Sequence, residues 1–267
     1  EDLGVQIVRR GQRYHGLTEE GERVLRWARR IVEDFDRMRA ELRLEGEALE
    51  GRLTIGAIPS ALPAVPALCA ALAARHPKLH YTVLSRSSAD IERGLESFDL
   101  DAGITYTDNE PLARGVVQPL YVERYRLFVR EDHPLAGHDT VTWAEAAEHP
   151  LCTLTTDMQN RRIVQAAFRR AGRSPAPQAE SNSLVNLCAF VSSGSYASVL
   201  PEYLLSIVGG AARIRAVPLV EPVIEHGVGL VTLERSPPPR AVAALAEAAR
   251  SFRPPEGIGG PAARSGS

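Results

Sequence analysis

Polar side chains that are suited to holding a small molecule recur where apolar runs end. Ser60 follows the apolar run 53–58, and Ser88 opens a later helical pattern. Hydroxyl groups beside helix N-termini can bind a polar or anionic group, because the first turn of a helix presents unpaired N–H groups. Further residues of this kind lie at the ends of other runs, namely Thr105, Tyr106, Thr155, Thr156, Met158, Gln159, Asn160 and Asn182. Each alone is better explained as a helix cap, but together they predict one effector site.

Patterns that support catalysis are not found. The seven histidines are scattered and show no HExxH spacing, and no serine lies in a GxSxG turn. No glycine-rich phosphate loop follows a strand. The three cysteines, Cys69, Cys152 and Cys188, lie far apart and predict reduced core residues rather than a zinc site. We therefore expect no enzymatic activity, no cofactor and no metal.

Composition bounds the class of protein. The chain has 267 residues, 44% of them hydrophobic, which suffices for one large or two small domains. A net charge of −2 gives no general reason for binding nucleic acid. No apolar run approaches the roughly 18 residues of a membrane span, and no signal peptide precedes the first strand. We expect a cytoplasmic protein without membrane contact.

Apolar runs and helical stripes alternate after residue 51. Residues 53–58 predict a buried strand, and Leu62 to Leu72 follow at helical spacing, with Pro66 placing the helix start near Ala64. We expect the corner 59–61 to have no regular secondary structure. Strands near 79–84, 100–105, 125–129, 151–154 and 228–233 alternate with helices near 88–97, 143–147, 160–171, 183–192 and 240–252. This order predicts a parallel sheet covered by helices on both faces.

The first fifty residues have a different pattern. Residues 3–17 predict a small hairpin with three arginines, Arg9, Arg10 and Arg13, and the alternative is a solvated turn. A charged helix follows from Thr18 to about Glu47. Its apolar seam, Leu25, Ala28, Val32, Phe35 and Leu42, predicts pairing with the same helix of a second subunit. Packing of this seam on the next domain is the alternative.

The residues 1–10, EDLGVQIVRR, followed by LTEEG at 17–21, resemble the wing and linker helix of LysR-type transcriptional regulators. Further likenesses are GRLTIG at 51–56, FDLDAGI at 98–104 and DHPLA at 132–136. Phe98 stands near the place where the family commonly has the glycine that ends a helix. The resemblance implies that the wing arginines contact DNA and that Ser60 and Ser88 contact an effector's acidic group. The helix-turn-helix that precedes the wing in this family is absent from the sequence.

The resemblance implies an α/β fold with two Rossmann-like lobes of the periplasmic-binding-protein type 2. We expect a remnant of the winged helix-turn-helix at 1–17, a dimerisation helix at 18–50, and a disordered tail at 253–267. Between them we expect subdomain I at 51–127, subdomain II at 128–225, and a return to subdomain I at 226–252. The expected function is a DNA-binding regulator, a homodimer or homotetramer, that senses a small polar or anionic effector between its lobes. The alternative is a solute-binding protein of a transport system.

Overall fold

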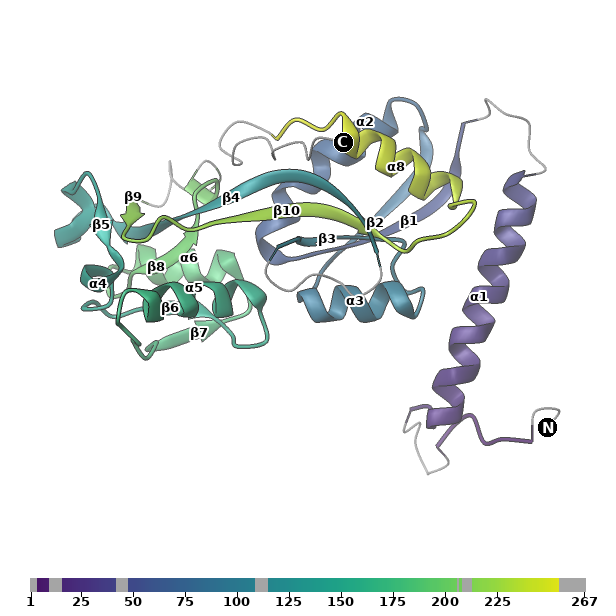
Figure 1. Ribbon diagram of the computed structural model, residues 1–267, viewed down its shortest axis with the longest axis horizontal. Helices are drawn as coiled ribbons and strands as arrows, with labels where there is room; N and C mark the ends of the chain where they lie inside the picture. Colours follow the sequence, from purple (N-terminus) through teal and green to yellow (C-terminus); the bar gives the residue numbers. More distant parts are fainter. Residues whose placement is uncertain are drawn as a thin grey trace.

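Two long strands tie the two halves of the molecule together (Figure 1). In the computed structural model, which describes residues 4–9, 16–41, 48–108, 115–205, 207 and 213–254, these are β4 (Val116–Arg130) and β10 (Glu225–Thr232). They pair in antiparallel register, from Glu225 opposite Arg124 to Thr232 opposite Val116, with a bulge at Val228 and Gly229. Since both strands pass from one half to the other, the halves are joined by two crossings, the geometry of a hinge.

The first half, here called lobe I, contains the strands at one end of the sheet, three α-helices and a short 3₁₀ helix. Its strands β1 (Glu50–Ala57), β2 (Lys78–Ser85) and β3 (Ala102–Tyr106) follow the order β2-β1-β3-β10. The short 3₁₀ helix η1 (Pro59–Ala64), then α2 (Val65–Ala73), and the last helix α8 (Arg240–Arg250) lie on one face, and α3 (Ser88–Glu96) lies on the other (Figure 1). Glycines at 56 and 103 let α3 pack closely on the sheet, because a Cβ on either would clash with Leu100 or Ile91.

The second half, lobe II, continues the same curled sheet. Strand β4 pairs here with β8 (Ser198–Pro201) and with β9 (Ile214–Val220), and β9 pairs with β5 (Val141–Thr142). A separate pair is formed by β6 (Cys152–Leu154) and β7 (Ala179–Ser181). The helices are α4 (Trp143–Ala146), α5 (Gln159–Arg170) and α6 (Leu184–Ser192), and η2 (Pro134–Gly137) lies at the entry. The ring of Trp143 packs edge-on against that of Phe168, 5.0 Å between centroids, at the centre of this lobe.

The first helix stands apart from both lobes. Helix α1 (Glu19–Glu41) begins with Thr18, whose hydroxyl accepts the N–H of Gly21. It contacts lobe I through an ion pair of 2.6 Å between Arg29 and Asp99. Before it, Val8 and Leu17 form an antiparallel bridge, as a hairpin requires. Within the part of the chain that is described, no helix is long and apolar enough to cross a membrane.

Several sequence expectations need correction. The sheet is mixed rather than parallel, because β10 and β4 run against their neighbours. The corner after β1 is a 3₁₀ helix, started by Pro59. Strand β9 was not expected, and the strand predicted at 125–129 is one piece of the fifteen-residue β4. The predicted helix end at 42–47, with Leu42, and the tail from 255 onward lie outside the described residues.

Candidate functional site

A small hollow lies between the two lobes. Lobe I contributes η1, the start of α3 and the end of β3, and lobe II contributes the end of β6 and the start of α5. The lining residues are Ile58, Pro59, Ser60, Ser87, Ser88, Tyr106, Leu154, Met158, Gln159 and Asn160. Three chain corners that are distant in sequence thus meet at one place, as ligand sites at strand ends commonly do.

The local sequence explains how each corner presents its polar groups. Proline at the first position of η1 fixes the chain so that Ser60 is buried in the turn. Helix α3 is capped by Ser87, whose hydroxyl accepts the N–H of Asp90. Ser88 is therefore the first residue within the helix rather than the cap, and its hydroxyl accepts a 3.0 Å hydrogen bond from Thr105. At α5 the N-cap is Met158, which offers no side-chain oxygen.

The hydroxyl of Tyr106 is the centre of a hydrogen-bond network that joins the lobes. It donates to Oε1 of Glu123 at 2.5 Å and accepts from Tyr125 and from Nδ2 of Asn160, both at 3.1 Å. Its distance to Oγ of Ser60 is 3.3 Å. A second link between the lobes runs from the hydroxyl of Tyr203 to the carbonyl of Ser60. Groups that line the hollow on both lobes are thus connected to a carboxylate on strand β4, which crosses between the lobes.

Glu123 is a buried acid within the hinge, 1% exposed. Burial raises the pKa of Glu123 to about 7, although hydrogen bonds from Tyr106, Tyr125 and Ser60 lower it in part. Burial and the nearby Glu123 carboxylate raise the pKa of Tyr106 well above its ordinary value. Across the strands Glu123 lies opposite His226, which is 3.1 Å from Asp108. The hinge therefore contains several titratable groups around one buried carboxylate.

The hollow brings together six of the ten residues expected to bind an effector. These are Ser60, Ser88, Tyr106, Met158, Gln159 and Asn160. The other four lie outside the lining: Thr105 is buried behind Ser88, Thr155 lies beyond the lining residues of β6, and Thr156 and Asn182 are exposed. Arg161 is buried with Nε 3.7 Å from Glu180, and Arg162 donates to the carbonyls of Thr156 and Asp157. Neither arginine lines the hollow.

Sequence patterns missed several residues of this network. Glu123, Tyr125 and Tyr203 were not singled out, since nothing in the sequence says which face of β4 is turned to the cleft. The available signal is Glu123, the one acid in the stretch 120–129, and it is weakened by the two arginines of that stretch, Arg124 and Arg126. A charge in a buried strand is rare unless it is paired or functional.

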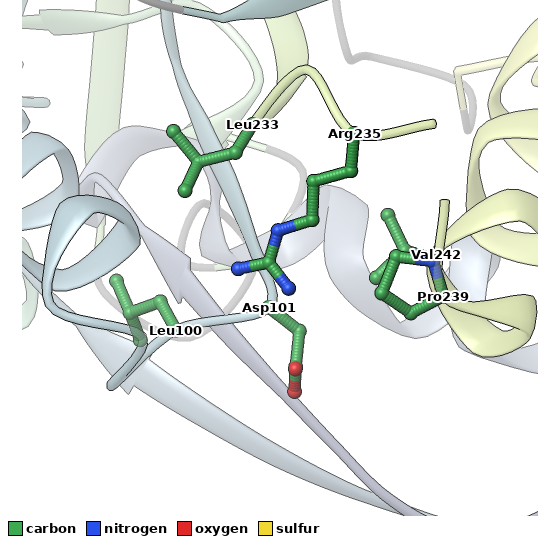
Figure 2. Close-up of a pocket in the computed structure, with 6 residues that line it drawn as sticks. All are labelled: Leu100, Asp101, Leu233, Arg235, Pro239 and Val242. Carbon is green, nitrogen blue, oxygen red and sulfur yellow. The ribbon is translucent and has the colours of Figure 1, made fainter. Parts of the chain in front are cut away.

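A second small hollow lies within lobe I beside α8. Figure 2 shows the Arg235 guanidinium group directed into it on the side of Asp101. The Asp101 carboxylate accepts the N–H of Thr54 at 2.7 Å, which fixes the start of β3 beside β1. Because burial outweighs this bond, the pKa of Asp101 is raised. This hollow touches one lobe alone, so a molecule bound there would not join the lobes.

Metal and thiol chemistry have no visible centre. Among the described residues, no group of three or more His, Cys, Asp or Glu side chains is placed to hold a metal ion. All three cysteines are free, and Cys152 and Cys188 are buried. Burial raises the pKa of each of these two thiols to about 11. Thiolates, which are the reactive form, are scarce at such a pKa.

A hinged pair of α/β lobes with a hollow between them defines a class of proteins that bind small molecules. Residues 46–253 match the profile of the LysR substrate binding domain. The chain therefore belongs to the LysR family through this domain, and its lobes have the periplasmic-binding-protein type 2 arrangement expected from the sequence.

Individual relatives agree with this assignment. The chain is 29% identical over 177 residues to the HTH-type transcriptional regulator SsuR of Burkholderia cenocepacia, a match that covers 66% of the chain and 58% of SsuR. Over 252 residues it is 27% identical to the DNA-binding transcriptional dual regulator OxyR of Escherichia coli, covering 94% of the chain and 82% of OxyR. The structure of a full-length OxyR variant from Pseudomonas aeruginosa superposes with a TM-score of 0.74 at 25% identity, covering 93% and 81% of the two chains.

Proposed function

We propose that the chain is part of a DNA-binding transcription regulator whose cleft senses a small polar molecule. The Tyr106 network carries this proposal, since it links groups of both lobes beside the hollow. A ligand that contacts Ser60 on lobe I and Asn160 on lobe II favours one relative position of the lobes over others. Its differential affinity for that position is the free energy that shifts the equilibrium.

The wing and α1 would carry this change to DNA. Of the expected DNA-contacting residues, Arg9 is described and exposed, whereas Arg10 and Arg13 lie outside the described residues. Contacts of arginines with phosphates position a protein on DNA without specifying sequence. The named relatives are DNA-binding or HTH-type regulators, which supports this role. No observation favours the alternative of a transport protein.

Helix α1 supports self-association. Its residues Val32 and Phe35 are 59% and 54% exposed, and Trp27, Ile31 and Met38 expose further apolar surface. Leu25 is half-buried and Ala28 is exposed. In the single chain most of the predicted seam is thus left accessible, which fits pairing with a second copy better than packing on lobe I.

Other relatives are named hydrogen peroxide-inducible genes activators. Two of the three thiols of this chain are buried and have pKa values of about 11. The third, Cys69, is half-buried, and burial raises its pKa as well. Reaction with peroxide needs an accessible thiolate, so a thiol-based peroxide response is not part of our proposal.

The test is thermal melting of the chain against a panel of small metabolites. We expect at least one compound to raise the melting temperature, and Ser60→Ala to reduce that rise, because the hydroxyl lines the hollow and touches the Tyr106 network. Thr156→Ala is the matched control, since Thr156 is exposed outside the hollow, and it should leave the rise unchanged. A panel without any effect, or an equal effect of both variants, contradicts the proposed site.

A further inference from the structure

Gln159 has an unusual place in the hollow. It is the first residue of α5, is 2% exposed, and lines the cavity. Neither its Nε2 nor its Oε1 has a hydrogen-bond partner among the described residues. Buried side-chain amides are nearly always hydrogen-bonded in folded proteins. An amide that is buried and unpaired on both sides, in a residue that lines a cavity, therefore indicates a ligand with both a donor and an acceptor.

The charge around the hollow narrows the ligand further. None of its ten lining side chains is ionisable near neutral pH. Two carboxylates lie one hydrogen bond behind the lining, Glu123 behind Tyr106 and Asp90 behind Ser87. Arg161 faces Glu180, and Arg162 is directed to backbone carbonyls. A buried anion would thus meet no cation and would lie near a carboxylate, an arrangement that is costly without compensating charge. The N-terminus of α5 favours an acceptor atom, which a carbonyl oxygen supplies without net charge.

We propose that the hollow binds an uncharged molecule that carries a primary amide or a group of the same donor–acceptor pattern, and that Gln159 selects it. This inference rests on the proposed function and narrows the expected ligand from polar or anionic to uncharged. Nε2 of Gln159 would donate to the ligand carbonyl while Oε1 accepts from the ligand N–H. Ile58, Leu154 and Met158 form the apolar wall for the rest of the molecule. A carboxylate of the same shape has no proton to give to Oε1.

The experiment uses matched pairs of probes, propionamide with propionate and benzamide with benzoate, added to the isotope-labelled chain. The side-chain amide signals of Gln159, assigned through their bonds to the backbone signals of that residue, are followed by NMR at neutral pH. We expect each amide to shift these signals with a dissociation constant about tenfold or more below that of its carboxylate. Gln159→Met should remove this preference. Gln165→Met, on the same helix but outside the hollow, should keep it.

Each outcome decides the inference. A preference for the carboxylates, equal affinity within each pair, or a preference that survives Gln159→Met overturns it while leaving the proposed sensing function intact. If no probe moves the Gln159 signals, the inference is also overturned, and an inert metabolite panel would then remove the proposed function as well. The comparison within each pair is made on the unaltered chain, so it stands even if Gln159→Met fails to fold.

Discussion

Glu123 is the residue whose environment departs furthest from that of its chemical type. It is buried on a strand that crosses between lobes, and one of its oxygens, Oε1, accepts from Tyr106. Its second oxygen, Oε2, has no partner among the described residues. The carboxyl is more easily protonated in the folded chain than in the unfolded one, since burial raises its pKa from 4.5 to about 7. Folding and proton binding are therefore linked at this residue.

This linkage predicts the pH dependence of stability. The folded-state pKa of Glu123 is raised, so its contribution is fully present below about pH 4.5 and is lost as pH rises through about 7. Glu123→Gln keeps the shape and stays neutral. Relative to this variant, the wild type should lose on the order of 3 kcal/mol of unfolding free energy across that window, measured by urea unfolding.

Other titratable groups near the hinge need a control. His226 and Asp108 lie beside the same network. Burial also raises the pKa of four tyrosines, Tyr106, Tyr121, Tyr125 and Tyr203. His226→Gln removes the histidine and should leave the difference between wild type and Glu123→Gln in place. If the unfolding free energies of the wild type and Glu123→Gln differ by the same amount at every pH, the carboxyl of Glu123 is not the linked group.

Helix α1 is the element whose packing is incomplete within one chain. Its exposed apolar residues lie on a helix that meets lobe I through Arg29. Val32→Glu puts a charge into this surface, and we expect it to weaken self-association by about tenfold or more, as light scattering over a dilution series would show. Arg26→Glu adds the same carboxylate at an exposed charged position and serves as the control. If the unsubstituted chain is monomeric, the predicted pairing of α1 with a second copy is contradicted.

The helices and strands that could be predicted are those with a clear local pattern of apolar residues and prolines. The apolar spacing and Pro66 placed the start of α2 within one residue. Strand β9 is not evident from the sequence, because Arg215 and Pro218 interrupt its apolar run and its pairing with β4 and β5 stabilises it. Near Phe98 the family commonly has the glycine that ends this helix. In this chain Phe98 itself takes the left-handed conformation after α3, with φ of 60°. Its ring lies 4.4 Å from the guanidinium carbon of Arg235.

The candidate site was predicted only in part for a related reason. Strand ends and helix starts are readable from sequence, so Ser60, Ser88, Gln159 and Asn160 could be singled out. The connection of Ser60 and Asn160 through Tyr106 to Glu123 depends on the order of the sheet, in which β10 lies between β3 and β4. Register and curvature arise from long-range pairing, and a single sequence does not contain them as a local pattern.

At the scale of the whole molecule, the two crossings and the polar link between lobes have opposite effects on motion. The strands β4 and β10 permit the lobes to change angle, whereas Tyr106–Asn160 and Tyr203–Ser60 hold them together. In our proposal, a ligand in the hollow contacts both lobes and so favours one relative position of the lobes over others. The central claim is that binding in this hollow changes how the lobes lie relative to each other.

The most direct measurement is the distance between spin labels on the two lobes. Labels at Arg93→Cys on α3 and Arg169→Cys on α5 occupy exposed positions, in a Cys69→Ser background that removes the least buried native thiol. With the compound that raises the melting temperature most, we predict a narrower distance distribution with a shifted maximum, and Ser60→Ala should weaken this change. A distribution that stays the same under saturating compound would contradict the claim.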